Sequence, residues 1–105
     1  MGIKFDGTNV KNGSKVVANM KRSDELREGS SPGGKALGNS KRSNEIREGS
    51  SPGGKALCNI KDGKNIRLGS SPGGKTQIKI SDAAKAIGTS AQGPSTALVW
   101  WFFGR

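Results

Sequence analysis

The sequence predicts an all-β protein, an antiparallel meander of short hairpins built from 20-residue repeats. The stretch "REGSSPGGKAL" occurs at residues 27–37 and again at residues 47–57, and a related copy, "RLGSSPGGKTQ", runs over residues 67–77. Segments of six to eight residues separate the turn signals, a length that suits strands. Between those turns, residues alternate in character with a period of two, which is the signature of a strand.

The repeats divide the chain into six segments. Residues 21–40, 41–60 and 61–80 share a Lys, an acidic or polar turn, an aliphatic residue, an Arg and then Gly-Ser-Ser-Pro-Gly-Gly-Lys. Residues 1–20 align as a divergent N-terminal repeat, residues 81–96 as a degenerate repeat, and residues 97–105 form an apolar C-terminal anchor. Because a unit of this length cannot bury a core alone, we expect neighbouring units to pack on one another.

Two turns define each repeat. The first is Asp62-Gly63, where glycine accepts a positive φ, and Ser23-Asp24 and Ser43-Asn44 are weaker versions of it. The second is Ser-Pro-Gly-Gly, in which proline fixes φ at one corner and excludes a helix or a central strand. In the strand that follows, one face carries small or apolar residues, and the other carries polar residues together with Val17, Leu37 and Leu57. The small or apolar set includes Ala18, Gly38, Cys58 and Ile78, and the polar set includes Asn19, Asn39, Asn59 and Lys79.

Composition leaves two other architectures open. Leu, Ile, Val and Phe number 19 of 105 and the net charge is +10. A content of these four residues below about 20%, combined with a high net charge, is typical of disordered chains. The alternatives are an extended, non-globular chain ordered by its partner and a parallel β-solenoid with one rung per repeat. No window has the spacing of an amphipathic helix, and the apolar face is thin, so we expect a marginal sheet without a closed, packed core.

The apolar run at residues 97–103 is the densest hydrophobic stretch of the chain. It is much shorter than the roughly 20 residues that a membrane span needs. We expect it to be a buried terminal strand or a docking anchor, with four aromatic side chains as the anchor: Trp100, Trp101, Phe102 and Phe103.

Catalysis and metal binding find little support in the residue types. The chain has no histidine and a single cysteine, Cys58, which removes the commonest general base and a thiol-based metal site. We therefore expect no enzyme, no catalytic residue, no metal and no cofactor. Residues 69–76 match the phosphate-loop pattern, but that loop works between a strand and a helix in an α/β domain. We interpret the stretch as a turn whose backbone amides and Lys can contact an anion.

The basic excess predicts an acidic partner. The basic residues of successive repeats recur in register, and they would lie about 9.5 Å apart if they stand on every second strand. Several weak contacts made by one protein reinforce one another through effective concentration. The predicted partner-binding residues are Arg27, Lys35, Arg47, Lys55, Arg67, Pro72, Gly73, Gly74 and Lys75. The three full repeats, residues 21–80, contain no aromatic residues, which disfavours single-stranded nucleic acid, while a duplex backbone remains an alternative.

Residues 58–78, "CNIKDGKNIRLGSSPGGKTQI", resemble the microtubule-binding repeats of tau-type proteins, and short Pro-Gly-Gly motifs also occur in Jupiter-type microtubule-associated proteins. The resemblance implies a tubulin-like partner, an intracellular, cytoplasmic or cytoskeletal location, and microtubule contacts. Those contacts would lie on Lys61, Asn65, Ile66, Arg67, Ile78 and the Pro-Gly-Gly-Lys residues Pro72, Gly73, Gly74 and Lys75.

Together these observations predict a non-enzymatic structural or binding repeat protein. It would dock along an acidic polymer or within a large assembly, with a microtubule as the favoured partner. The alternative is a self-contained β-repeat module that binds a polyanion, either nucleic acid or glycan, or that self-associates.

Overall fold

The computed structural model describes residues 2–22, 24–42 and 44–105. Nine strands form one antiparallel sheet in strict chain order, which confirms the predicted meander. The Cα radius of gyration is 12.4 Å, close to the roughly 13 Å expected of a compact chain of this length. The extended chain and the parallel solenoid are therefore wrong. The strands are β1 (Ile3–Phe5), β2 (Asn9–Asn12), β3 (Lys15–Asn19), β4 (Glu25–Glu28), β5 (Ala36–Asn39), β6 (Glu45–Glu48), β7 (Ala56–Asn59), β8 (Asn65–Leu68) and β9 (Thr76–Lys79).

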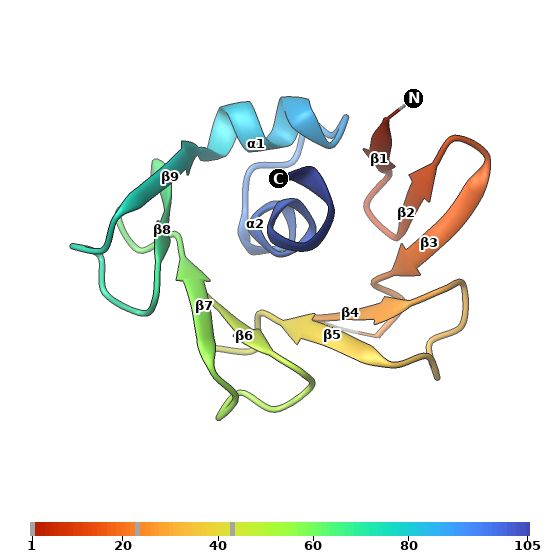
Figure 1. Cartoon of the computed structure of the whole chain (residues 1–105), viewed down its shortest axis with the longest axis horizontal. Coiled ribbons are helices and arrows are strands. Elements are labelled where there is room, and N and C mark those ends of the chain that lie inside the picture. Colours follow the sequence, from red (N-terminus) through yellow and green to blue (C-terminus); the bar gives the residue numbers. More distant parts are fainter. Residues whose placement is uncertain (1, 23, 43) are drawn as a thin grey trace.

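The sheet curls because the strands are paired unequally. Within hairpin β4–β5 three residue pairs align, whereas β5 and β6 of successive hairpins share only two. The hairpins β2–β3, β4–β5, β6–β7 and β8–β9 therefore splay outward around a common centre (Figure 1). At the inner corners between hairpins, Asp24 and Asn44 have φ of 60° and 58°, and Gly63 has φ of 79°, as the predicted turns require. Ser23 and Ser43 of those turns lie outside the described residues.

One helix closes the ring of hairpins and a second runs through its centre (Figure 1). Helix α1 (Ile80–Ala86) lies between β9 and β1, and the Phe5 amide donates a 2.8 Å hydrogen bond to the Ile87 carbonyl just after it. Helix α2 (Pro94–Val99) continues into the π-helical turn η1 (Trp100–Gly104) and runs through the centre. The sheet's two edge strands are thus joined through α1, which covers an edge that would otherwise pair with other chains. No helix in the described part of the chain is long and apolar enough to cross a membrane.

The C-terminal run is a helix, so the expectation of a terminal strand is wrong. Its consecutive apolar residues give it a hydrophobic surface on every side, which suits a helix enclosed by sheet. The expectation that no segment has helical spacing is wrong too. Ile80, Ala83, Ala84 and Ile87 are all buried, and they follow the i, i+3, i+4, i+7 pattern of one helix face.

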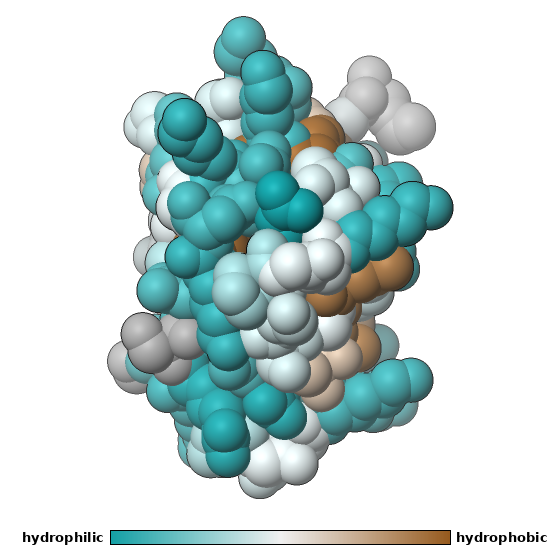
Figure 2. Space-filling view, turned by 90° about the vertical axis from the view of Figure 1, so that its left-hand side faces the viewer, coloured by the Kyte–Doolittle hydropathy of each residue, from teal (hydrophilic) through white to brown (hydrophobic). Residues whose placement is uncertain are grey.

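The core is a set of large residues facing small ones around the central helix. Val10, Leu26, Ile46 and Ile66 are all 0% exposed. The first three pair across their hairpins with the small residues Ala18, Gly38 and Cys58, whereas Ile66 pairs with Ile78. The small partners leave room for the helix, since a Cβ at Gly38 would lie 2.7 Å from the Phe102 ring. A closed, packed core therefore exists, because the last segment supplies the apolar surface that the repeats lack. Viewed from the side of β8 and β9, the surface is mostly hydrophilic, with hydrophobic residues toward one edge (Figure 2).

Candidate functional site

The three copies of Gly-Ser-Ser-Pro-Gly-Gly-Lys form the outer ends of three hairpins, and we call residues 29–35, 49–55 and 69–75 the tip loops. Each is braced by its own serine. The Gly33 amide donates to Ser31 Oγ at 3.1 Å and the Gly34 amide to the Ser31 carbonyl at 3.0 Å, and the other two loops repeat both bonds. The third tip loop joins β8 to β9. Its interpretation as a turn between strands is confirmed, and the strand–helix setting of a phosphate loop is absent there.

The second glycine of each tip loop is required by a close approach of backbone. A Cβ at Gly34 would lie 2.1 Å from the Glu28 carbonyl oxygen, and at Gly54 and Gly74 the corresponding distance is 2.2 Å. Side-chain carbons essentially never approach a backbone oxygen so closely. Only glycine therefore lets the loop fold back onto the end of its first strand, which explains why this residue recurs in all three copies.

The arginines of the repeats support the loops from inside. The Arg27 Nη1 group donates to the Gly34 carbonyl at 2.9 Å and Nε donates to Glu25 Oε1 at 2.8 Å. Arg47 makes the same contacts with Gly54 and Glu45. Arg67 reaches Gly74 at 2.9 Å and Asp62 at 2.6 Å. The three side chains are only 15–25% exposed, so the guanidinium groups that the sequence assigns to a partner are engaged within the protein.

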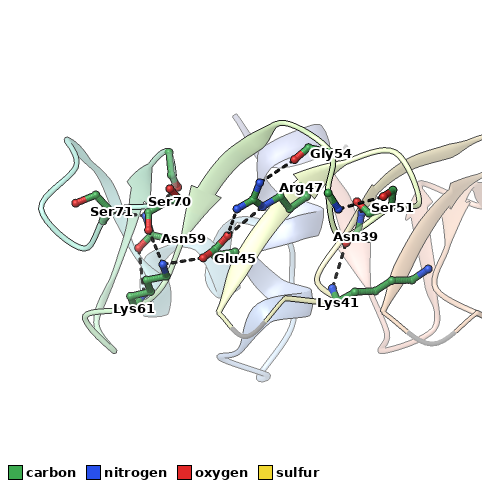
Figure 3. A network of polar contacts seen from close by, with 12 residues as sticks. Asn39, Lys41, Glu45, Arg47, Ser51, Gly54, Asn59, Lys61, Ser70 and Ser71 are labelled. Atoms are coloured by element: carbon green, nitrogen blue, oxygen red, sulfur yellow. Dashed lines mark hydrogen bonds and ion pairs between the residues drawn. The ribbon is translucent and has the colours of Figure 1, made fainter.

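A second brace links each tip loop to the preceding hairpin (Figure 3). The Asn39 Nδ2 group donates to the Gly49 and Ser51 carbonyls, both at 2.9 Å. Lys41 Nζ donates to the Ser50 carbonyl at 2.7 Å and pairs with Glu25 at 2.6 Å. Asn19 and Asn59 hold the first and third loops in the same way. These asparagines, expected on a polar face, are fully buried, and their 20-residue spacing is the signal that could have revealed their role.

The network keeps its carboxylates charged. The pKa of Glu25 lies below its ordinary value because Lys41, and then Arg27, donate hydrogen bonds to it, and Lys61 and Arg47 do the same for Glu45. The pKa of Asp62 is lowered first by the Asn65 backbone amide and then by Arg67. Five cations thus share three carboxylates, Glu25, Glu45 and Asp62. The frame under the loops is ionised and internally satisfied at neutral pH.

The remaining predicted residues fall into two groups. Lys35, Lys55 and Lys75 are exposed at the tips, and none belongs to an ion pair within the described residues. Pro72 and Gly73 are exposed beside Lys75, and Gly74 is half-buried. The predicted anchor is split, because Trp100 is 7% exposed in the core whereas Trp101, Phe102 and Phe103 are half-buried at the end of the central helix.

A shallow groove adjoins the first tip loop. Its volume is about 400 Å³, and it is lined by Lys15, Val16, Val17, Glu28, Gly29, Gly34 and Lys35. Within residues 2–22, 24–42 and 44–105, no group of three or more His, Cys, Asp or Glu side chains is placed to hold a metal ion. The tip loops with their exposed lysines are thus the feature with the clearest capacity to bind.

Comparison with protein-family models, with curated protein sequences and with solved structures found no match to this chain. The physical properties of the tip loops are therefore the basis for assigning a function.

Proposed function

We propose that this protein is a non-enzymatic binding module that docks on an acidic polymer through its three tip loops. The observation that carries the proposal is the repetition of one basic loop on one rigid frame. Each loop presents an exposed lysine, and the buried asparagines and arginines fix the loops relative to one another.

Repetition makes weak contacts useful. An exposed lysine–carboxylate pair contributes only about 0–1 kcal/mol, which gives no stable complex by itself. Once one loop is bound, the others meet the partner at a high effective concentration, so the contacts reinforce one another. Because the tips point outward in different directions around the ring (Figure 1), a partner that engages more than one of them has to present acidic groups that curve around part of the ring.

The microtubule lattice is the acidic polymer that we favour, which would place the protein in the cytoplasm or on the cytoskeleton. The support is the part of the tau-type resemblance that is exposed and outside the described ion pairs, namely Pro72, Gly73 and Lys75. Lys61 is also exposed, but it pairs with Glu45. Ile66 is fully buried and Arg67 is bound to Asp62. The folded protein would therefore bind through its tips, and a contact through Ile66 would need the hairpin to unfold.

Co-sedimentation with microtubules at two salt concentrations tests the proposal. The loop variant carries Lys35→Gln, Lys55→Gln and Lys75→Gln. The control loses the same charge through Arg22→Gln, Arg42→Gln and Lys85→Gln, since these three residues are exposed and belong to no described ion pair. Three lost contacts of up to about 1 kcal/mol each should weaken binding by roughly 3- to 100-fold. The control should weaken it much less.

Two results would overturn the proposal. Equal losses in the two variants would mean that general positive charge, and not the tip loops, causes pelleting. Absence of pelleting at low salt, together with salt-sensitive binding to duplex DNA, would reassign the protein to a nucleic-acid backbone, whose binding depends steeply on salt.

A further inference from the structure

The end of the repeat array differs from its interior at two paired positions. In the first two repeats Glu25 lies opposite Asn39 and Glu45 lies opposite Asn59. At the same positions of the third repeat, Asn65 lies opposite Lys79. A carboxylate has been replaced by a neutral amide, and an amide by an ammonium group. The change raises the net charge of the pair from −1 to +1. The first hairpin has Asn9 opposite Asn19 at these positions, so only the lysine is specific to the third repeat.

In the first two repeats, the paired Glu and Asn residues contact the hairpin that follows. Asn39 binds the carbonyls of the next tip loop, and Glu25 binds Lys41 at the start of the next repeat. After the third repeat there is no further tip loop, because β9 leads into α1, and Ser81 stands where the earlier repeats have lysine. No hairpin therefore occupies the place beside Asn65 and Lys79, where α1 begins.

A pocket of about 410 Å³ occupies this place, and we call it the end pocket. It is lined by Gly63, Lys64, Asn65, Lys79, Ile80, Ser81 and Gln92. Its volume lies within the roughly 300–1,000 Å³ of pockets that hold small ligands. The surface on this side of the molecule is mostly hydrophilic (Figure 2). The end pocket is thus open, lined by both polar and apolar surface, and of the right size for a small molecule.

The lining has positive charge and spare donors. Lys64 replaces Asp24 and Asn44 of the earlier repeats, so both lysines of the end pocket are specific to the third repeat. In the described part of the chain neither takes part in an ion pair. The lining contains no carboxylate. The adjacent Asp62 carboxylate already accepts hydrogen bonds from the Lys64 and Asn65 backbone amides and from Arg67.

We propose that the end pocket binds a small anion that carries a phosphate group, such as a phosphomonoester. Lys64 and Lys79 supply the two charges that match a phosphate dianion, and charge-assisted hydrogen bonds from ammonium groups are among the stronger ones. The Ser81 hydroxyl and the Gln92 amide supply neutral donors. This site is separate from the tip loops, and it stands whether or not the tip loops bind an acidic polymer.

Amide NMR titrations with inorganic phosphate and with glycerol 3-phosphate, at constant ionic strength, test the site. We expect saturable shifts centred on the amides of Gly63, Lys64, Asn65 and Ser81. The variant Lys64→Asn/Lys79→Asn restores the residues of the second repeat, and it should raise the Kd at least tenfold. The charge-matched control Arg22→Asn/Arg42→Asn changes two exposed cations outside both the end pocket and the tip loops, and it should leave the Kd within about twofold.

The single variant Lys79→Arg keeps the charge and should retain binding, which separates loss of a ligand contact from loss of the fold. Shifts that do not saturate, or that spread evenly over the lysines of the whole surface, would overturn the proposal. Equal weakening in the end-pocket variant and in the Arg22→Asn/Arg42→Asn control would overturn it as well. Tighter binding of succinate than of glycerol 3-phosphate would show that the pocket takes a dicarboxylate and not a phosphate.

Discussion

Replacing Gly38 by alanine tests the packing of the central helix against the sheet. A Cβ at this position would lie 2.7 Å from Phe102 Cε2, 2.9 Å from Leu98 Cδ1 and 3.0 Å from the Arg47 carbonyl oxygen. Carbon atoms pack favourably at about 3.5–4.0 Å. The added methyl group therefore has to displace two side chains of the central helix while the backbone of the next hairpin limits movement on the other side.

Two opposing effects set the size of the change. Overpacking a core of this kind costs about 1–3 kcal/mol. Alanine also restricts the unfolded chain, which returns about 0.4–1 kcal/mol where the backbone tolerates it. We expect the free energy of unfolding to fall by about 1–2 kcal/mol. If the helix did not pack here, only the second effect would remain and the variant would be more stable than the parent.

Urea unfolding followed by tryptophan fluorescence measures the difference. Gly33→Ala is the matched control, because its Cβ would meet only the Ser31 hydroxyl oxygen at 3.5 Å, and surface changes of this kind stay within about 0.5 kcal/mol. Adding Phe102→Leu to the Gly38→Ala variant should cost less than the sum of the single changes, since the two sites are in contact. A Gly38→Ala protein as stable as the parent would refute the packing.

Three further predictions concern the frame of the tip loops and the core. Asn39→Ala removes two hydrogen bonds to the loop carbonyls of Gly49 and Ser51, each worth about 0.5–1.5 kcal/mol, and should lower the free energy of unfolding in urea by about 1–3 kcal/mol, whereas the exposed Asn12→Ala should leave it unchanged. Because Lys61 holds the pKa of Glu45 below its ordinary value near 4.5, the stability from this pair is present above that value and is lost as the pH falls through the lowered pKa. Glu45→Gln should flatten the acid side of a pH–stability curve, and an unchanged curve would contradict the pairing. Burial raises the pKa of the Cys58 thiol to about 12, so a disulfide reagent at pH 8 should label it only after unfolding, and fast labelling of the native protein would show that the thiol is accessible.

The turns and strands of the hairpins could be predicted from the sequence, because the repeat contains the residues that determine them. Proline and glycine set the tip loops, the Asp-Gly turn and its variants set the inner corners, and the alternation between them is satisfied only by strands. Because the turns are short and evenly spaced, successive strands pair as neighbours, and the meander follows.

The central helix and the hydrogen-bond network under the tip loops could not be predicted from the sequence in the same way. A short run of uniformly apolar residues has no polar positions to mark its period, so a buried strand and a buried helix read alike. Arg27 and Arg47 follow Glu25 and Glu45 by two residues, so each pair lies on the same face of a strand. This spacing predicts the ion pairs within the protein that engage the two arginines. The end pocket is visible only once the fold shows that no hairpin follows Lys79.

The most direct measurement is the NMR contact between the Phe102 ring and the Gly38 α-protons in the isolated protein. The free chain is a closed ring of hairpins folded around its own C-terminal helix, and it presents the tip loops without help from a partner. A strong nuclear Overhauser effect between these groups is the predicted result, since a Cβ at Gly38 would lie 2.7 Å from the ring. A spectrum of unfolded character, or a folded spectrum without this contact, would contradict it.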